Sequence, residues 1–346
     1  MTTGPVASSR APVLVDFALQ GGGAHGAFTW GVLDRLLEEP GLGIDGISGT
    51  SAGAMNAAVL VDGFAHNGAE GARAALENFW RRVSQAAVLS PFRRSPLDVL
   101  LGRWTLDYSP MFVAMDMMAR VFSPYDLSPS GANPLRNVLA EVVDFDRLTR
   151  APIKLFVTAT NVRTGRGRVF RNGEITPDVL LASACLPTMF QAIEIDGESY
   201  WDGGYSGNPT ITPLVRECTA SDILLVQVNP VERSGSPRTA REILNRLNEV
   251  SFNAVLLKEL RMIALLRQVA PSDGSEGAKW AAMRMHRIAS DLVADLGSSS
   301  KMNAEWEFLT MLRDEGRRCA QAFLTDHGAD LGRRSSLDID HLLEEV

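Results

Sequence analysis

The serine best suited to nucleophilic chemistry is Ser51, which lies in a G-x-S-x-G motif between an apolar stretch at residues 44–48 and an Ala-rich stretch at residues 52–61. The motif consists of Gly49, Thr50, Ser51, Ala52 and Gly53. A strand that runs directly into a helix places a nucleophile on a sharp, strained turn, where small neighbours avoid clashes. The helix N-terminus adds positive potential for a developing negative charge. The motif alone also fits a glycine-rich turn with an idle serine, so its context must decide.

A glycine-rich motif lies one strand earlier, directly after the apolar run at residues 13–19. It fits G-x-G-x-x-G and consists of Gly21, Gly22, Gly23, Ala24, His25 and Gly26. Backbone N–H groups of such a loop can approach an anion. A dinucleotide would also need an acidic residue that closes a second strand, whereas Asp45 precedes its strand. The second candidate anion is the oxyanion of a tetrahedral intermediate at a nearby nucleophile.

A serine nucleophile needs a base within hydrogen-bond reach, and Asp202 is the leading candidate. It follows a predicted strand at residues 193–201 and precedes Gly203 and Gly204, so its loop can approach another backbone closely. The same Asp-Gly sequence is common in plain hairpin turns, and the spacing favours neither interpretation. An aspartate can act as the base where the site is dry and proton transfer accompanies attack.

A histidine in a Ser–Asp–His triad is the alternative base, and the chain has five histidines: His25, His66, His286, His327 and His341. The last three follow Ser51 and Asp202 in the order typical of α/β-hydrolases. However, His286 lies in a predicted helical segment, and His327 near the end of another helix suits a C-terminal charge partner. Surface or capping roles fit these histidines better than catalysis does.

Taken in order, the three motifs resemble the patatin-like phospholipase family. The resemblance includes Ala182-Ser183-Ala184-Cys185-Leu186-Pro187, Phe190 and residues 158–161, and it covers residues 13 to about 230.

The resemblance implies a Ser–Asp dyad without a catalytic histidine, a metal or a cofactor. Ser51 would attack a lipid ester, and Asp202 would take its proton and later activate the water that releases the acyl group. Backbone N–H groups of residues 22–24 would hold the oxyanion. Phospholipids, lysophospholipids and neutral lipids are the substrates that the family suggests. A non-catalytic lipid-binding protein on the same scaffold is the remaining alternative, and the intact motifs argue against it.

His25 departs from the family pattern, because many members carry Arg or Lys at this position. A histidine supplies a positive charge to an oxyanion only when it is protonated. The required donors are backbone groups, so we expect activity to persist with His25. The sequence predicts that His25→Arg changes the pH dependence more than it lowers turnover.

Strands and helices alternate through most of the chain, which predicts a three-layer α/β/α fold with a mostly parallel central sheet. The predicted strands lie at residues 13–19, 44–48, 153–159, 168–171, 193–201 and 223–228. The predicted helices in this part lie at residues 28–37, 52–61 and 178–184. We expect a flexible N-terminus at residues 1–12, a catalytic domain at residues 13–230 with an irregular insertion at about 80–136, and a helical C-terminal extension at residues 231–346.

The C-terminal extension is predicted to hold helices at residues 239–270, 279–296 and 303–324, with a short acidic helix or frayed tail at 338–345. The first helix carries an apolar stripe, as does the last long one; such stripes usually cover a core. Their members are Ile243, Leu247, Val250, Ala254 and Leu257, and Trp306, Phe308, Leu309 and Leu312. The Met-rich segment at residues 108–122 favours a core helix over a lid or lipid-facing surface.

Composition excludes several classes of protein. The 346 residues carry a net charge of −7 and no basic block, which argues against a nucleic-acid partner. Three widely separated cysteines predict buried reduced thiols rather than a disulfide framework or a zinc site. The start of the chain lacks a signal-peptide pattern, and no stretch reaches the ~20 apolar residues that span a bilayer. We therefore expect a cytoplasmic protein whose membrane contact, if any, is peripheral.

Overall fold

The central sheet of the computed structural model is mostly parallel, as the sequence predicts. The structure describes residues 12–90, 92–128, 131, 133–270 and 273–343. Their eight strands are β1 (Val13–Leu19), β2 (Leu42–Gly49), β3 (Lys154–Asn161), β4 (Gly167–Arg171), β5 (Ile193–Ile195), β6 (Glu198–Asp202), β7 (Asp222–Val226) and β8 (Arg284–Ile288). The order is β5-β6-β3-β2-β1-β7-β8, and β4 pairs with β3. Strands β3, β2, β1, β7 and β8 run parallel, whereas β4, β5 and β6 are antiparallel to their neighbours.

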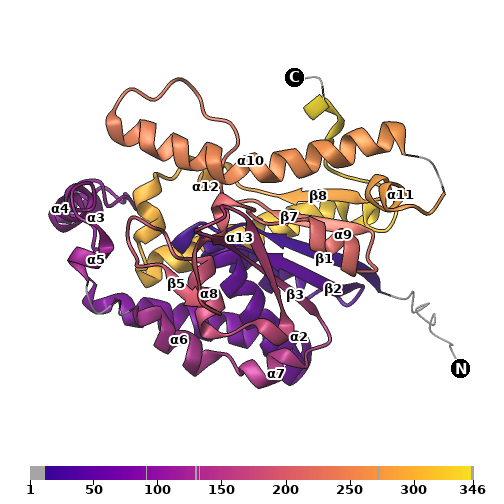
Figure 1. The fold of residues 1–346 in the computed structure, drawn as a ribbon, viewed down its shortest axis with the longest axis horizontal. Coiled ribbons are helices and arrows are strands. Elements are labelled where there is room, and N and C mark those ends of the chain that lie inside the picture. Colours follow the sequence, from indigo (N-terminus) through magenta and orange to yellow (C-terminus); the bar gives the residue numbers. More distant parts are fainter. Residues whose placement is uncertain (1–11, 91, 129–130, 132, 271–272, 344–346) are drawn as a thin grey trace, which may run out of the picture.

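Helices cover both faces of the sheet, which gives the three-layer α/β/α architecture (Figure 1). One layer contains α1 (Gly26–Leu36), α2 (Ala52–Ala86), α6 (Pro134–Val142), α7 (Phe145–Thr149), α8 (Pro177–Ser183) and α13 (Trp306–His327). The other contains α9 (Thr212–Glu217), α10 (Ala240–Val269) and α11 (Glu276–Ala281). Helix α12 (Asp291–Asp295) follows β8, and α2 is kinked at Asn67 and Gly68.

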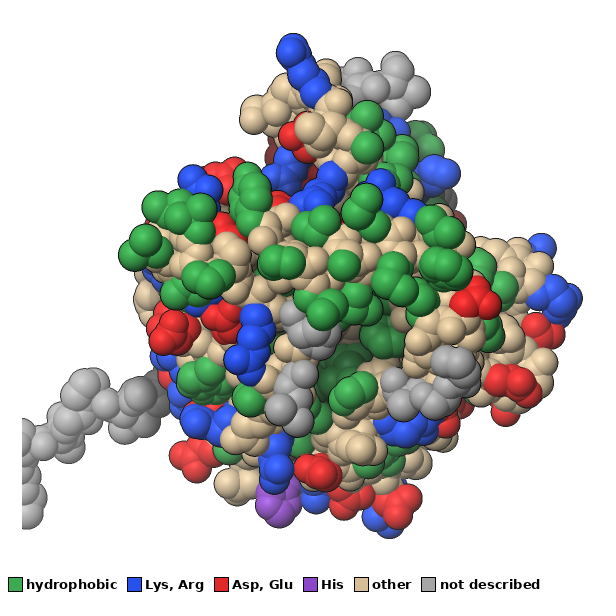
Figure 2. Space-filling view, turned by 90° about the vertical axis from the view of Figure 1, so that its left-hand side faces the viewer, with side chains coloured by type: hydrophobic (Ala, Val, Ile, Leu, Met, Phe, Trp, Pro, Cys, Tyr) green, Lys and Arg blue, Asp and Glu red, His purple; other side chains and the backbone are tan. Residues whose placement is uncertain are grey.

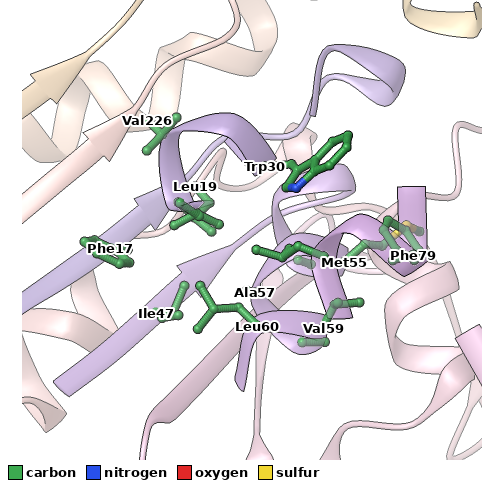
Figure 3. Close-up of a cluster of buried hydrophobic side chains, with 14 of the residues drawn as sticks. Phe17, Leu19, Trp30, Ile47, Met55, Ala57, Val59, Leu60, Phe79 and Val226 are labelled. Carbon is green, nitrogen blue, oxygen red and sulfur yellow. The ribbon is translucent and has the colours of Figure 1, made fainter. Parts of the chain in front are cut away.

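The larger core lies between the sheet and the layer of α1, α2 and α13. Phe17 and Leu19 of β1 are fully buried there, facing Trp30 of α1 and Leu60 of α2. Figure 3 shows these side chains converging from strands and helices that are far apart in the sequence. Ala18, between the two β1 residues, belongs instead to the core under α9, α10 and α11. This alternation explains why β1 is an apolar run: both faces of the strand are buried.

The insertion is helical rather than irregular, so that expectation is wrong. It contains α3 (Pro96–Leu100), α4 (Pro110–Met118) and α5 (Pro124–Leu127), and it leads into α6. Each of these helices begins at a proline that follows Ser or Asn. Proline is well suited to the first helical position, because the N–H that it lacks would have no partner there. The prolines therefore mark helix starts.

The predicted helix at residues 279–296 is also wrong, because α11, β8 and α12 replace it. Strand β8 extends the sheet by pairing in parallel with β7. The predicted helices at 239–270 and 303–324 are confirmed as α10 and α13. The short helix expected near the end is a 3-10 turn at Asp340–Leu343, and residues 344–346 lie outside the described part, as do residues 1–11 of the predicted flexible N-terminus.

The Met-rich helix α4 lies on the surface rather than in the core, which corrects a third expectation. None of its residues is buried, and Met117 is 64% exposed. The stripe on α10 divides in two: Ile243, Leu247 and Val250 are exposed, whereas the C-terminal half of the helix buries Leu260 against the core. The stripe on α13 is confirmed, with Phe308, Leu309 and Leu312 fully buried.

Exposed hydrophobic side chains gather on one face of the molecule. Figure 2 views the side on which α3, α4 and α5 lie in Figure 1 and shows these side chains spread around a hollow. The first turn of α10 joins this region, because Arg241 pairs with Asp107 at 2.8 Å, just before α4. We call the following exposed residues the apolar face: Leu97, Val99, Leu100, Leu101, Tyr108, Met111, Met115, Met117, Met118, Val121, Phe122, Tyr125, Leu127, Ile243, Leu244, Leu247 and Val250.

No helix in the described part of the chain is both long and apolar enough to cross a membrane. The three cysteines, Cys185, Cys218 and Cys319, are all buried and unbridged, as their spacing predicts.

Candidate active site

Ser51 occupies a strained turn between β2 and α2. Its φ of 54° and ψ of −124° fall outside the ordinary regions for a residue with a side chain, and it forms the N-cap of α2. The flanking glycines are required sterically. A Cβ at Gly49 would lie 2.6 Å from the Gly53 carbonyl oxygen, and one at Gly53 would lie 2.2 Å from that of Leu19. The sequence G-x-S-x-G thus allows the turn to press against the end of β1.

Asp202 ends β6 and is buried, with only 2% of its surface exposed. Its backbone N–H donates to the Cys185 carbonyl at 2.8 Å, and its carbonyl accepts from the Thr160 hydroxyl at 2.8 Å. The N–H of Gly204 donates to the carboxylate at 2.7 Å, and the Ser51 side chain lies near enough to lower the pKa of the same group. Ser51 and Asp202 are far apart in the sequence, but the fold places them close together.

The pKa of Asp202 is raised to about 7, which changes what this carboxylate can do. Burial is the main cause, because it disfavours the charged form. The hydrogen bond from Gly204, the nearby Ser51 side chain and the positive charge of Lys301 act in the opposite direction. A carboxylate with a pKa near neutral is a much stronger base than an exposed aspartate, yet it is still ionised in an appreciable fraction at neutral pH.

The glycine loop lies directly against the turn that carries Ser51. A Cβ at Gly21 would be 2.6 Å from the Cβ of Ser51, and one at Gly26 would be 2.7 Å from the Cβ of Ala52. A side chain at either position would push the loop away from the serine. The loop continues into a 3-10 turn at Gly23–His25 and then into α1. Its glycines therefore serve close backbone approach, as the motif suggests.

The backbone N–H groups of the loop fall into two sets. Gly21 donates to Asn208 Oδ1 at 2.7 Å, and the amides of His25 and Gly26 bond back to carbonyl groups of the loop. Within the described residues, no acceptor is found for the amides of Gly22, Gly23 and Ala24. Three consecutive amides beside Ser51 thus remain available for an anion.

The Ser51 turn is also held from the opposite side by Ser183 of α8. The Ser51 N–H donates to Ser183 Oγ at 2.9 Å, and Ser183 Oγ donates to the Thr158 carbonyl at 2.7 Å. A Cβ at Gly203 would lie only 2.1 Å from this same carbonyl oxygen. The Ala182–Pro187 and 158–161 segments, which carry the family resemblance, therefore connect the serine turn with the Asp202-Gly203-Gly204 loop.

The histidines do not join this site as bases. The ring of His286 is buried in β8 and contacts Asp222 Oδ1 at 3.0 Å and Ser336 Oγ at 2.9 Å. His327 contacts Asp330 at the end of α13, and His66 and His341 are exposed. Among the described residues, no hydrogen bond links a histidine to Ser51 or Asp202.

His25 is buried and its ring is neutral, so it does not supply a positive charge to an oxyanion. Its Nε2 lies 2.7 Å from Ser300 Oγ, and burial, aided by Lys301, holds the pKa of His25 well below its usual range. The sequence-based prediction that His25→Arg changes mainly the pH dependence therefore no longer holds. An arginine at this position would have to enter a closed space that already holds the charge of Lys301.

The sequence does not indicate three polar residues of the site, which are Asn208, Asn229 and Lys301. Asn208 holds the Gly21 amide, and Asn229 Nδ2 donates to the Gly21 carbonyl at 2.6 Å. Lys301 Nζ in turn donates to Asn229 Oδ1 at 2.7 Å. Single asparagines and lysines in loops carry no motif, so the sequence offered no signal for them.

One cluster in the described residues has the composition of a metal site: Asp16, Asp45 and Cys218, whose ligand atoms lie within 4.8 Å of one another. Asp45 already accepts hydrogen bonds from Thr219 and Lys154. Burial and the neighbouring Asp45 raise the pKa of Asp16 to about 8, which keeps this carboxyl protonated at neutral pH. The cluster is therefore better suited to holding a proton than a cation.

Comparison with models of protein families identifies the family of this chain. The family model "Patatin-like phospholipase" matches residues 17–215, more than half of the chain, so the chain belongs to this family. The match spans the glycine loop, Ser51 and Asp202, and family membership supports lipid hydrolase activity. None of the curated proteins compared with the chain matches it.

Two solved structures show weaker likenesses. VipD from Legionella pneumophila is 16% identical, with 89% of this chain and 67% of that chain covered and a TM-score of 0.36. A chain of the ExoU–SpcU complex from the type III secretion system of Pseudomonas aeruginosa is 18% identical, with 97% and 76% covered and a TM-score of 0.28. Likenesses at this level carry no information about the site.

Proposed function

We propose that this protein is a lipid acyl hydrolase in which Ser51 is the nucleophile and Asp202 is its base. The observation that carries the proposal is that a serine on a strained strand-to-helix turn lies close to a buried carboxylate whose pKa is raised. Family membership supplies the substrate class, an ester of a lipid.

Ser51 Oγ attacks the ester carbonyl carbon while its proton passes to Asp202. The carbonyl oxygen becomes an oxyanion, which the amides of Gly22, Gly23 and Ala24 stabilise by hydrogen bonds. As the C–O bond of the ester breaks, Asp202 returns the proton to the departing alcohol and an acyl-enzyme remains. Asp202 then takes a proton from water, the hydroxide attacks the acyl carbon, and the fatty acid leaves as Ser51 regains its proton.

The raised pKa of Asp202 suits both halves of this cycle. A general catalyst is most effective when its pKa lies near the working pH, since it must accept and donate the same proton in each turnover. Helix α10 helps to exclude water from the carboxylate through Phe252. A Cβ at Gly204 would lie 3.1 Å from the Phe252 ring, and the centroids of the Tyr205 and Phe252 rings are 5.0 Å apart.

Fluorophosphonate labelling with a screen of lipid esters tests the proposal. Wild type should be labelled and active, Ser51→Ala should be neither, and Asp202→Asn should lose about 10³-fold or more in kcat while remaining folded. Neutral lipids, phospholipids and lysophospholipids belong in the same screen. A folded wild type that is neither labelled nor active would favour the non-catalytic lipid-binding alternative.

The triad alternative needs its own control. His286→Gln, His327→Gln and His341→Gln should each retain turnover, because a triad histidine cannot be lost without collapse of kcat. Collapse in any one of these folded variants would replace Asp202 as the direct base.

A further inference from the structure

A lysine from the C-terminal region lies against the glycine loop. Lys301 belongs to the 3-10 turn Ser298–Met302, and a Cβ at Gly23 would come within 2.4 Å of the Lys301 carbonyl oxygen. The two backbones are therefore in contact, although nearly the whole chain separates them in sequence. The family match ends at residue 215, so this lysine lies outside the matched segment.

The Lys301 ammonium group connects to the loop through a single side chain. Its Nζ donates to Asn229 Oδ1 at 2.7 Å, and Asn229 Nδ2 donates to the Gly21 carbonyl at 2.6 Å. Asn229 is itself buried, and its N–H donates to Gln20 Oε1 at 2.9 Å. With both ends of its amide bound, Asn229 has one orientation, and the position of the ammonium group is transmitted to Gly21.

The charged and titratable groups around Lys301 are Glu249, Arg233, Asp202 and His25. Glu249 of α10 already pairs with Arg233 at 2.7 Å and with Arg246 at 3.2 Å. Asp202 has no such arginine partner among the described residues, so Lys301 is the positive charge that acts on it. Burial lowers the pKa of Lys301 to about 8, which leaves the ammonium group mostly charged at neutral pH.

His25 does not supply this charge, because burial and the neighbouring charge of Lys301 hold its pKa well below the usual range and keep the ring neutral. Ser300 Oγ donates its only proton to the Gly297 carbonyl at 2.6 Å, so the contact between Ser300 Oγ and His25 Nε2 must use a proton on the histidine. Nδ1 of His25 has no partner among the described residues. A proton added there would bring a second positive charge next to Lys301 in a buried space.

We propose that Lys301 is the fixed positive charge of this active site: it positions the glycine loop through Asn229 and stabilises the anions that form at Ser51. This role rests on the function proposed above. Lys301 is a positioning residue, since it reaches the reacting atoms through Asn229 and through its electric field. A preoriented charge in a site with little water favours the oxyanion more than the neutral ester, so it lowers the barrier rather than the KM.

Three variants test the role: Lys301→Met removes the charge, Lys301→Arg keeps it, and Lys258→Met makes the same change at an exposed lysine on α10. With a soluble ester, Lys301→Met should lower kcat about 10- to 100-fold and change KM less than about 3-fold. In Lys301→Arg, the logarithm of kcat should be higher than in Lys301→Met by at least a third of the difference between Lys301→Met and wild type. The kcat and KM of Lys258→Met should equal those of wild type.

The pH–rate profile separates an electrostatic role from a structural one. Wild-type kcat should fall above about pH 8, where Lys301 loses its proton. Lys301→Arg should keep its rate to a higher pH, since a guanidinium stays charged. In Lys301→Met the alkaline fall should vanish, and the acid limb should move to higher pH, because the charge that lowers the Asp202 pKa is gone.

The outcomes distinguish this proposal from the proposed function. If wild type shows neither labelling by a fluorophosphonate nor turnover, the proposed function fails and the Lys301 role fails with it. If wild type is active and folded Lys301→Met retains its kcat and pH profile, only the Lys301 role fails. Should Lys301→Met not fold, an alkaline limb at the same pH in wild type and Lys301→Arg would overturn the role.

Discussion

Burial acts in opposite directions on the ionisable side chains around Ser51. It raises the pKa of Asp202, which makes a weak acid into a useful base, and it lowers the pKa of His25 and of Lys301. The pKa of the Asp202 carboxyl is about 7, and the pKa of the Lys301 ammonium group is about 8. Both groups can therefore be charged together in a narrow pH range near neutral.

The acid side of this range is a testable consequence. Asp202 must be ionised to accept the Ser51 proton, so kcat/KM for a soluble ester should rise with pH and reach half its maximum near pH 7. His25→Gln should leave this limb in place, because the wild-type ring is neutral throughout. A half-maximum near pH 4, where an exposed aspartate titrates, would contradict the burial of the base.

Asp16 offers a stability test away from the site. Burial first, and the neighbouring Asp45 second, raise the pKa of Asp16 from 3.8 to about 8. Below pH 3.8, the pKa in the unfolded chain, the Asp16 carboxyl is protonated in both the folded and the unfolded state. As the pH rises from 3.8 towards about 8, the carboxyl ionises only in the unfolded chain, and the free energy of unfolding falls. Asp16→Asn removes this loss, so the variant should gain about 1–3 kcal/mol relative to wild type between about pH 4 and pH 7.5 in urea unfolding.

Asp45→Asn provides the contrast for Asp16. Despite partial burial, hydrogen bonds from Thr219 and Lys154 hold the pKa of Asp45 below its usual value, so its contribution is present at neutral pH and lost in acid. This variant should therefore lose stability relative to wild type as the pH rises. Equal pH dependence in the two variants would show that Asp16 is ionised in the folded protein.

At the scale of elements, the contact between α1 and α13 depends on two glycines. A Cβ at Gly316 of α13 would lie 2.1 Å from the Phe28 carbonyl oxygen, and one at Gly31 of α1 would lie 1.9 Å from that of Arg313. These contacts involve backbone atoms, so neither helix can yield without moving as a whole. The crossing is close because both helices present a glycine at the same point.

Gly316→Ala should lower the free energy of unfolding by about 1–3 kcal/mol, despite the better helix propensity of alanine, because the added methyl group overpacks this crossing. Thermal and urea unfolding measure the loss. Gly328→Ala is the matched control: it lies just after the same helix, and nothing lies within 4 Å of its added Cβ. A Gly316→Ala variant as stable as this control would show that the helices do not meet so closely.

The apolar face is the element-scale feature that a lipid hydrolase would use. Exposed methionine, leucine and aromatic side chains of α3, α4 and the first half of α10 can enter the surface of a lipid aggregate. Leu247→Glu should therefore reduce hydrolysis of vesicle lipids about 5- to 10-fold, while leaving a soluble ester unaffected.

Leu265→Glu is the control for this prediction, since Leu265 is similarly exposed (49% against 56%) on the other half of the same helix. Equal loss on vesicles from both variants would indicate a general effect of charge rather than contact at the apolar face.

Strand β1 and the two motif turns beside Ser51 were predictable because local rules determine them, whereas the single strand expected at residues 193–201 is a hairpin of β5 and β6. Strand β1 has the full extent that its apolar run predicts, and glycines mark both turns in the sequence. Strand β8 was missed because its short, charged sequence becomes a strand only by pairing with β7. The exposure of α4 was missed for a related reason: an apolar composition does not say which surface meets water. The place of Lys301 at the site could not be predicted either, because it results from a tertiary contact alone.

At the scale of the whole molecule, residues beyond 230 complete both the fold and the site. Strand β8 covers the edge of β7, Phe308 and Leu312 of α13 belong to the same core as Phe28 of α1, and Lys301 reaches the glycine loop. The sequence suggested a catalytic domain that ends at about 230, with a helical extension after it. Because these contacts join the extension to the first 230 residues, we predict that the two parts unfold as one cooperative unit.

A chain that ends at residue 230 should therefore be unfolded, because it leaves the edge of β7 unpaired and the α1 side of the larger core open. Full-length protein should unfold in one transition, with tryptophan fluorescence and far-UV circular dichroism giving the same midpoint in urea. Gly316→Ala should shift both curves together, since the α1–α13 crossing lies within that unit. Two separate transitions, or a cooperative transition in the chain that ends at 230, would mean that the C-terminal region folds on its own and only docks onto an independent catalytic domain.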